Sequence, residues 1–242
     1  MKHIKEYENF HLNESINENM FTDIWERFKT LTKKLFAGTP APTPTPKPTV
    51  KPKVPTVPPQ IEGQHMLYLP HQQGPSGAAK IVKIARGKEK LDAALRSKLL
   101  NNMPTSDPNY EKVKTLNDKD AVLAFLNYQK NTWGKYEKDA LSEIKSPKNL
   151  NVKKAIEKVA DKQFPVNFLT TVAYKESSFN PNPPTNKSYS GLYQIGDLAW
   201  KQLKKINPLK YKGDKPPLNP VLNAQAGHDY LKWTYEQFEK LL

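Results

Sequence analysis

A proline-rich run between residues 37 and 60 limits what this chain can fold into. Nine of its 22 prolines lie between Pro40 and Pro59, where they alternate with Thr, Val and Lys. Because proline fixes φ and lacks a backbone N–H, such a run forms neither helix nor sheet and favours polyproline II. At ~3.1 Å per residue, about twenty residues reach roughly 60 Å when fully extended. We therefore predict a docking segment at 1–36, a linker at 37–60 and a folded domain at 61–242.

The segment before the linker is predicted to contain a short amphipathic helix. Its apolar residues recur at three- and four-residue steps: Met20, Phe21, Ile24, Trp25, Phe28, Leu31 and Leu35. A helix this short is marginal by itself, so we expect residues 1–36 to fold against a partner protein. Packing back onto the folded domain is the alternative.

Composition excludes several classes of protein. The chain has no cysteine, which excludes a disulfide scaffold, a thiolate zinc site and a Cys nucleophile. The mean hydropathy is −0.76 and no apolar run approaches the ~20 residues of a membrane span. The five histidines show no metal-binding spacing, so no metal and no cofactor is predicted. The charged start, MKHIKEYENF, has no apolar signal region, so we expect no signal peptide.

The positive charge lies mainly on the folded domain. The formal charge is +14; residues 1–36 carry six basic and six acidic groups and the linker carries three Lys, which leaves +11 on residues 61–242. A basic domain is attracted to anionic polymers. Nucleic acid is one such polymer, but the lysines are scattered and no recognised nucleic-acid-binding motif is present, so nucleic acid is not the expected partner.

The domain after the linker is predicted to be all-α. Helix-period apolar positions cover residues 77–100, 119–145, 150–162, 165–178 and 221–240, and no stretch shows sustained strand alternation. About 180 residues are enough for a single hydrophobic core.

One carboxyl stands at the end of an apolar helical face. Leu169, Val172, Ala173 and Glu176 recur at helical spacing within 165–178 and so share one face. A carboxyl against apolar neighbours has its charged form disfavoured, so we expect the pKa of Glu176 to be raised, as a general acid near neutral pH requires. An ordinary surface Glu near a helix end is the alternative.

Three motifs here resemble the soluble lytic transglycosylase branch of the lysozyme superfamily. Residues 176–181 (ESSFNP) and 191–195 (GLYQI) are similar to that family's helix end and its GLMQI turn, with the family's interval of fifteen residues between the Glu and the Gly. Residues 223–231 fit its N-x-x-x-G-x-x-Y-L helix. The resemblance covers residues 164–236 and implies a lysozyme-like helical fold.

The resemblance also implies roles for single residues. Glu176 is the implied catalytic acid and base, Tyr193 takes the place of the family's usual Met in the groove floor, and Thr185 stands where the family commonly has Ser. Ser188 and Tyr189 replace a Gly-Ala pair, which predicts a bulkier loop over the sugar site. The predicted substrate-binding residues are Gln194, Tyr193, Thr185, Ser190, Tyr68 and Tyr230.

A segment that the family places after its Tyr-Leu helix occurs before it here. The family continues into an AYNAG-type or AHFLGxGGA-type segment that supplies an aromatic hydroxyl, and this sequence reaches Leu242 without one. Residues 68–79 (YLPHQQGPSGAA) look like that segment. We therefore predict a circular permutation, which is physically mild because domain termini often lie close together. Tyr68 is favoured over His71 as the aromatic contact, and a plain Gly/Pro turn is the alternative.

The resemblance implies cleavage of peptidoglycan between N-acetylmuramic acid and N-acetylglucosamine by one Glu, giving 1,6-anhydro products. A hydrolase would pair that Glu with a second carboxylate about 5 to 9.5 Å away. No Asp or Glu lies between Glu176 and Gly191, and Asp197 is expected to cap the next helix. We therefore favour a lytic transglycosylase. A hydrolase, a structural virion protein and a nucleic-acid binder are the alternatives.

The organisation of the chain suggests where it acts. A docking segment, a long linker and a wall-cleaving domain without a signal peptide are what a bacteriophage virion protein would need to open the host wall locally, acting in the periplasm. The expected partner of residues 1–36 is another virion or structural protein. A bacterial enzyme exported by a dedicated secretion machine is the alternative.

Overall fold

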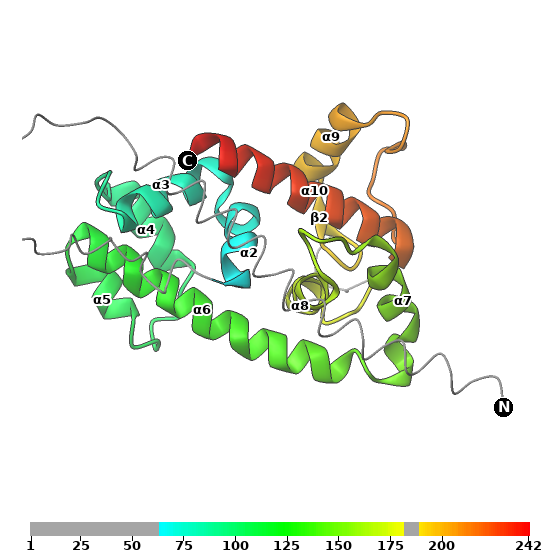
Figure 1. Cartoon of the computed structure of the whole chain (residues 1–242), viewed down its shortest axis with the longest axis horizontal. Helices are drawn as coiled ribbons and strands as arrows, with labels where there is room; N and C mark the ends of the chain where they lie inside the picture. The colour runs from blue at the N-terminus through cyan, green and yellow to red at the C-terminus, as the bar shows by residue number, and fades with distance from the viewer. Residues whose placement is uncertain (1–62, 182–188) are drawn as a thin grey trace, which may run out of the picture. The chain divides into compact units, whose positions relative to one another are not determined.

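The computed structural model describes residues 63–181 and 189–242 (Figure 1). The chain divides into two compact units, one of residues 1–56 with 161–165 and one of residues 57–160 with 166–242. The predicted docking helix and linker, like Thr185, lie outside the described residues. Within 161–165, the Asp161 carboxylate accepts hydrogen bonds from the backbone N–H groups of Gln163 and Phe164. All elements named below belong to the second unit.

The second unit is built almost entirely of helices, which confirms the predicted all-α class. Its longest helices are α6, Asp118–Glu143, and α10, Pro220–Leu241. The other elements are α2 (Gln64–Gln73), α3 (Pro75–Ala85), α4 (Ala93–Asn101), α5 (Tyr110–Thr115), η2 (Pro147–Asn149), α7 (Leu150–Val159), α8 (Val166–Ser177), β1 (Tyr189–Ser190), β2 (Ile195–Gly196) and α9 (Asp197–Ile206). None of the helices in the described ranges is both long and apolar enough to cross a membrane.

The segment predicted to be helical over 77–100 forms two helices. Gly87 adopts φ +71°, a left-handed conformation that ends the turn after α3. Asp92 then caps α4, because its carboxylate accepts a hydrogen bond from the Leu95 N–H at 2.7 Å. Residues 86–92 hold a single apolar residue, Leu91, which stands seven positions after Ile84; this helical spacing hid the interruption, although Gly87 and the polar residues around it are typical of a turn.

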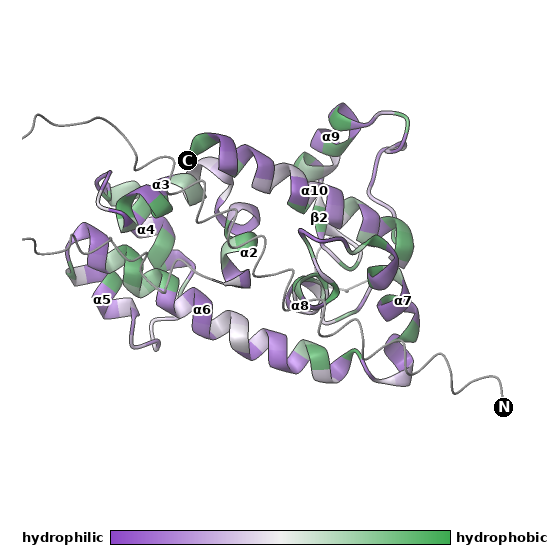
Figure 2. Ribbon diagram, viewed as in Figure 1, coloured by the Kyte–Doolittle hydropathy of each residue, from purple (hydrophilic) through white to green (hydrophobic). Residues whose placement is uncertain are grey.

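Helix α8 is central because other helices cover it. It packs against α6 and α7, and Figure 1 shows it nearly end-on between α6 and α10. Helix α10 packs against α2, α3 and α7. In Figure 2 the hydrophilic and hydrophobic residues of α10 alternate along its length, as expected for a helix with one buried face. This packing brings α2, from the start of the domain, next to helices near its end.

Candidate active site

Helix α8 places Glu176 at the edge of the core. Leu169, Val172 and Ala173 on the same face are at most 1% exposed, while the Glu176 side chain, one turn later, is 21% exposed. The helix stops at once because Ser178 and Phe179 both adopt positive φ, 51° and 63°. The carboxyl therefore lies on a rigid helix yet remains accessible.

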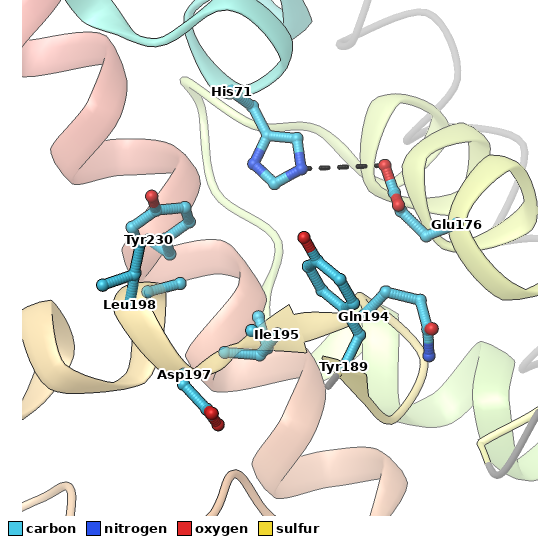
Figure 3. A pocket seen from close by; sticks show the side chains of 10 residues that line it. His71, Glu176, Tyr189, Gln194, Ile195, Asp197, Leu198 and Tyr230 are labelled. Carbon is cyan, nitrogen blue, oxygen red and sulfur yellow. Dashed lines mark ion pairs between the residues drawn. The ribbon is translucent and has the colours of Figure 1, made fainter. Parts of the chain in front are cut away.

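Two side chains of α2 meet this carboxyl. The Tyr68 hydroxyl donates a hydrogen bond to Glu176 Oε1 at 2.5 Å, and His71 Nε2 lies 3.6 Å from the same oxygen (Figure 3). Residues three apart in a helix share a face, which is why both reach one point. The tyrosine is 5% exposed and lies behind the carboxyl, whereas His71 lines the pocket. The predicted aromatic hydroxyl of Tyr68 thus reaches Glu176 from behind, and its contact with the substrate stays a prediction, since His71 and not Tyr68 lines the pocket.

The pKa of Glu176 is lowered, opposite to the direction predicted from its apolar face. Burial is the largest single influence on this pKa and raises it. His71, through hydrogen bonding and charge, the hydrogen bond from Tyr68 and the charge of Lys175 all lower the pKa, and together they outweigh burial. The prediction failed because all three groups lie outside the apolar stripe of α8 on which it was based.

Lys175 is held beside the carboxyl by two aromatic rings. Its Nζ lies 5.2 Å from the ring centroid of Tyr68 and 5.2 Å from that of Tyr136 on α6. Cation–π attraction of this kind is worth about 0.5–1 kcal/mol at an exposed site and more where water is excluded. The ammonium thus links α8, α2 and α6, and it keeps Tyr68 in place behind Glu176.

The opposing influences on the pKa of Glu176 predict how a substitution beside it changes the pH dependence of activity. In the His71→Phe variant the ring packing is retained but the N–H donor and its charge are lost, so the pKa of Glu176 rises. The role of proton donor that the family resemblance implies for Glu176 requires its protonated form, so activity should persist to higher pH. The measurement is kcat/KM for peptidoglycan against pH. Tyr68→Phe removes another donor and should move the alkaline limb in the same direction; a limb that stays in place or moves to lower pH contradicts the assignment.

The pocket beside Glu176 has a volume of about 440 Å³. Its lining residues are His71, Glu176, Tyr189, Gln194, Ile195, Gly196, Asp197, Leu198, Ala199 and Tyr230. In Figure 3 the Tyr189 hydroxyl points toward the space between His71 and Glu176, so the bulky residue noted in the sequence does reach the site. The Asp197 carboxylate points away from Glu176 in the same view. A groove of this size with one carboxyl facing it suits a sugar chain.

Asp197 does not have its predicted place. It is the first residue of α9, and Gly196 is the N-cap. Since Asp197 lines the pocket, a second carboxyl is present in the site that the sequence argument treated as having one. The Asp197 carboxylate is present in the pocket, but it points away from Glu176.

A buried asparagine fixes the opposite wall of the pocket. Asn223 of α10 is fully buried; its Nδ2 donates to the carbonyls of Ser190 at 3.0 Å and Pro217 at 2.9 Å, and its Oδ1 accepts from the Tyr193 N–H at 2.9 Å. The β1–β2 turn approaches so closely that Gly191, at φ +76°, has no room for a side chain. This anchor holds Gln194 over the pocket, where its Nε2 donates to the Gly191 carbonyl at 2.7 Å.

Tyr193 and Ser190 do not lie where the predicted roles would place them. Tyr193 is 2% exposed, packs against Gly227 and donates its hydroxyl to the Leu169 carbonyl at 3.1 Å. It supports the wall from beneath and does not line the pocket. Ser190 is not among the lining residues either, and its carbonyl is held by Asn223. Of the other predicted contacts, Gln194 and Tyr230 line the pocket.

Sequence reasoning ranked His71 below Tyr68 and gave Lys175 no role. The place of His71 three residues after Tyr68 was a usable signal that both reach Glu176. Lys175 gave only adjacency to Glu176, and its contact with Tyr136 joins residues of two helices far apart in the sequence. Adjacency alone does not reveal such a contact.

The helical fold with a carboxyl set in a groove is consistent with a lysozyme-like transglycosylase domain. Residues 153–242 match the family model described as Transglycosylase SLT domain, whose members are lytic transglycosylases acting on peptidoglycan. This match confirms the predicted enzyme class, a peptidoglycan lytic transglycosylase. Neither a curated protein nor a solved structure matches the chain. The matched range contains Glu176 and the pocket wall but not α2.

Proposed function

We propose that this protein cleaves peptidoglycan glycan strands with Glu176 as its single catalytic carboxyl, leaving 1,6-anhydro-N-acetylmuramic acid ends. The observation that carries the proposal is Glu176 itself, half-buried in the groove, hydrogen-bonded by Tyr68 at 2.5 Å and faced by His71 at 3.6 Å. These two groups orient one carboxyl oxygen. The geometry suits a residue that gives up a proton and later takes one back.

The proposed chemistry uses one group in two steps. Protonated Glu176 donates its proton to the glycosidic oxygen between the two sugars as the bond to the anomeric carbon breaks. The resulting carboxylate then takes the proton of the muramyl C6 hydroxyl while that oxygen attacks the anomeric carbon. No water is consumed, and Glu176 is protonated again at the end. A bound strand removes water from Glu176, which favours its protonated form.

The products decide between this mechanism and hydrolysis. A muralytic hydrolase is the second candidate, because Asp197 lines the same pocket. Purified sacculi incubated with the full chain should release muropeptides lighter by one water than the hydrolytic products, as measured by mass spectrometry. Release of the heavier, reducing-end products instead would assign a hydrolase, and intact sacculi would refute both.

The proposal includes a circular permutation of the domain. The family match begins at residue 153, whereas the groups that contact Glu176 from outside α8 come from α2 at 64–73. These contacts support the idea that residues 66 to about 145 occupy the place of the family's usual C-terminal segment. A rearranged gene that joins residues 63–145 after residue 242, with 150 as the new start, should give an active domain. An insoluble or inactive rearranged chain would count against the permutation.

We also propose a setting for this activity. Residues 1–36 would dock on another virion or structural protein, and the linker at 37–60 would let the catalytic domain reach the host wall from a bacteriophage particle. The support is the amphipathic pattern and the proline run, both features of the sequence. Mass spectrometry of purified particles tests the proposal, since the full chain should be found in intact virions and its absence from them would refute this setting.

A further inference from the structure

A second pocket continues the groove on the side away from Glu176. It has a volume of about 580 Å³ and is lined by Leu198, Lys201, Gln202, Lys204, Lys205, Tyr230 and Trp233. Leu198 and Tyr230 line both pockets, and Figure 3 shows them next to each other. A polymer lying in the catalytic pocket can therefore extend into the second pocket without leaving the protein surface.

One side of the second pocket is an aromatic platform. Tyr230 and Trp233, three residues apart on α10, stack with ring centroids 5.7 Å apart and an interplanar angle of 24°. Both side chains are half-buried, and Leu198 beside them is 81% exposed. Flat aromatic and aliphatic groups left open in this way suit small apolar groups such as methyls.

The facing side is cationic. Lys201, Lys204 and Lys205 of α9 line the pocket, and no acidic residue does. Lys204 donates to the Gly213 carbonyl at 3.0 Å. In the described ranges, 63–181 and 189–242, neither Lys201 nor Lys205 forms an ion pair, and both are exposed. Two ammonium groups without carboxylate partners next to an apolar platform favour a ligand that carries both carboxylates and small apolar groups.

We propose that this pocket binds the acidic stem peptide of a muramyl residue next to the bond that is cut. The stem peptide of peptidoglycan combines alanyl methyl groups with free carboxylates, which matches the platform and the lysines. The sugar backbone carries N-acetyl methyl groups but no free carboxylate where the lactyl groups are amide-bonded to stem peptides, so the lysines favour the peptide. The inference rests on the proposed function, because it is a strand held at Glu176 that presents its stem peptide here.

The test compares two substrates and two variants of the full chain. One substrate is glycan strands with intact stem peptides; the other is the same strands after amidase treatment, which keep only the lactyl carboxylate. K201Q/K205Q should raise KM about five- to tenfold for the peptide-bearing strands and less than twofold for the trimmed strands, with kcat unchanged. The control K212Q/K215Q removes the same charge from two exposed lysines outside the pocket and should change neither KM.

The outcomes separate this inference from the proposed function. If the wild type cuts neither substrate, the proposed function fails. If the wild type cuts both and K201Q/K205Q changes both KM values equally or neither of them, the stem-peptide site is refuted while the enzyme assignment stands. Since lysines beside aromatic rings also suit single-stranded nucleic acid, a short oligonucleotide is the competitor to include. Inhibition by it that K201Q/K205Q abolishes, without any stem-peptide effect, would also overturn the proposal.

Discussion

Glu176→Gln should reduce muropeptide release by at least about 10³-fold, because the amide can neither give a proton to the glycosidic oxygen nor take one from the C6 hydroxyl. The substitution keeps the size of the side chain and leaves the Tyr68 hydroxyl an amide oxygen as its acceptor. We therefore expect an unchanged melting temperature and retained binding to sacculi. The measurements are product release by mass spectrometry and co-sedimentation with insoluble peptidoglycan.

Asp197→Asn is the matched control for that variant. It makes the same chemical change at the other carboxyl of the pocket, which points away from Glu176. We expect activity within about threefold of the wild type. An Asp197→Asn variant as inactive as Glu176→Gln would show that two carboxyls are needed, which is the requirement of a hydrolase. Substantial activity of the Glu176→Gln variant itself would remove Glu176 from the mechanism.

Gly191→Ala should destabilise the domain strongly, because the added methyl meets a buried side chain and the backbone at this position is left-handed. The new Cβ would lie 2.0 Å from Asn223 Nδ2 and 2.2 Å from its Cγ, and Asn223 is fully buried and held by three hydrogen bonds. Overpacking costs about 1–3 kcal/mol, the φ of +76° about another 1–2, and each buried hydrogen bond that breaks about 1. With one hydrogen bond broken, the loss is about 3–6 kcal/mol, or on the order of 10 °C in melting temperature.

Gly87→Ala separates the cost of the left-handed backbone from the cost of the clash with Asn223. Gly87 has a similar φ of +71°, but no atom lies within 4 Å of the place a Cβ would take, so only the backbone cost of about 1–2 kcal/mol applies. Thermal unfolding of the two variants should differ by several degrees, with Gly191→Ala the lower. Activity of Gly191→Ala should fall even where it is folded, because the β1–β2 turn carries Gln194. Equal melting temperatures would mean that the turn can move away from Asn223.

The parts of the site that could be predicted are those formed by residues close together in the sequence. The Glu176 motif and the GLYQI turn lie in one segment, and their resemblance to the lytic transglycosylases indicated both the enzyme class and the residue for which a catalytic role is proposed. Tyr68 was found only because its own segment resembles one that the family places elsewhere. The sign of the Glu176 pKa shift was wrong, because it depends on His71 and Lys175 as well as on the apolar face of α8.

Local patterns predicted the longer helices of the domain, α6, α8 and α10 among them, and indicated the enzyme class by resemblance, because helix periodicity and short motifs act over a few neighbouring residues; α2 and α5 lie outside the predicted segments. Only the tertiary structure decided that α2 lies against α8, that Tyr193 lies beneath the pocket and that Asp197 faces away from Glu176. Those facts follow from packing between helices that are far apart in the chain. Many side chains contribute to the free energy of that packing, so the arrangement of the helices could not be predicted from any single stretch of sequence.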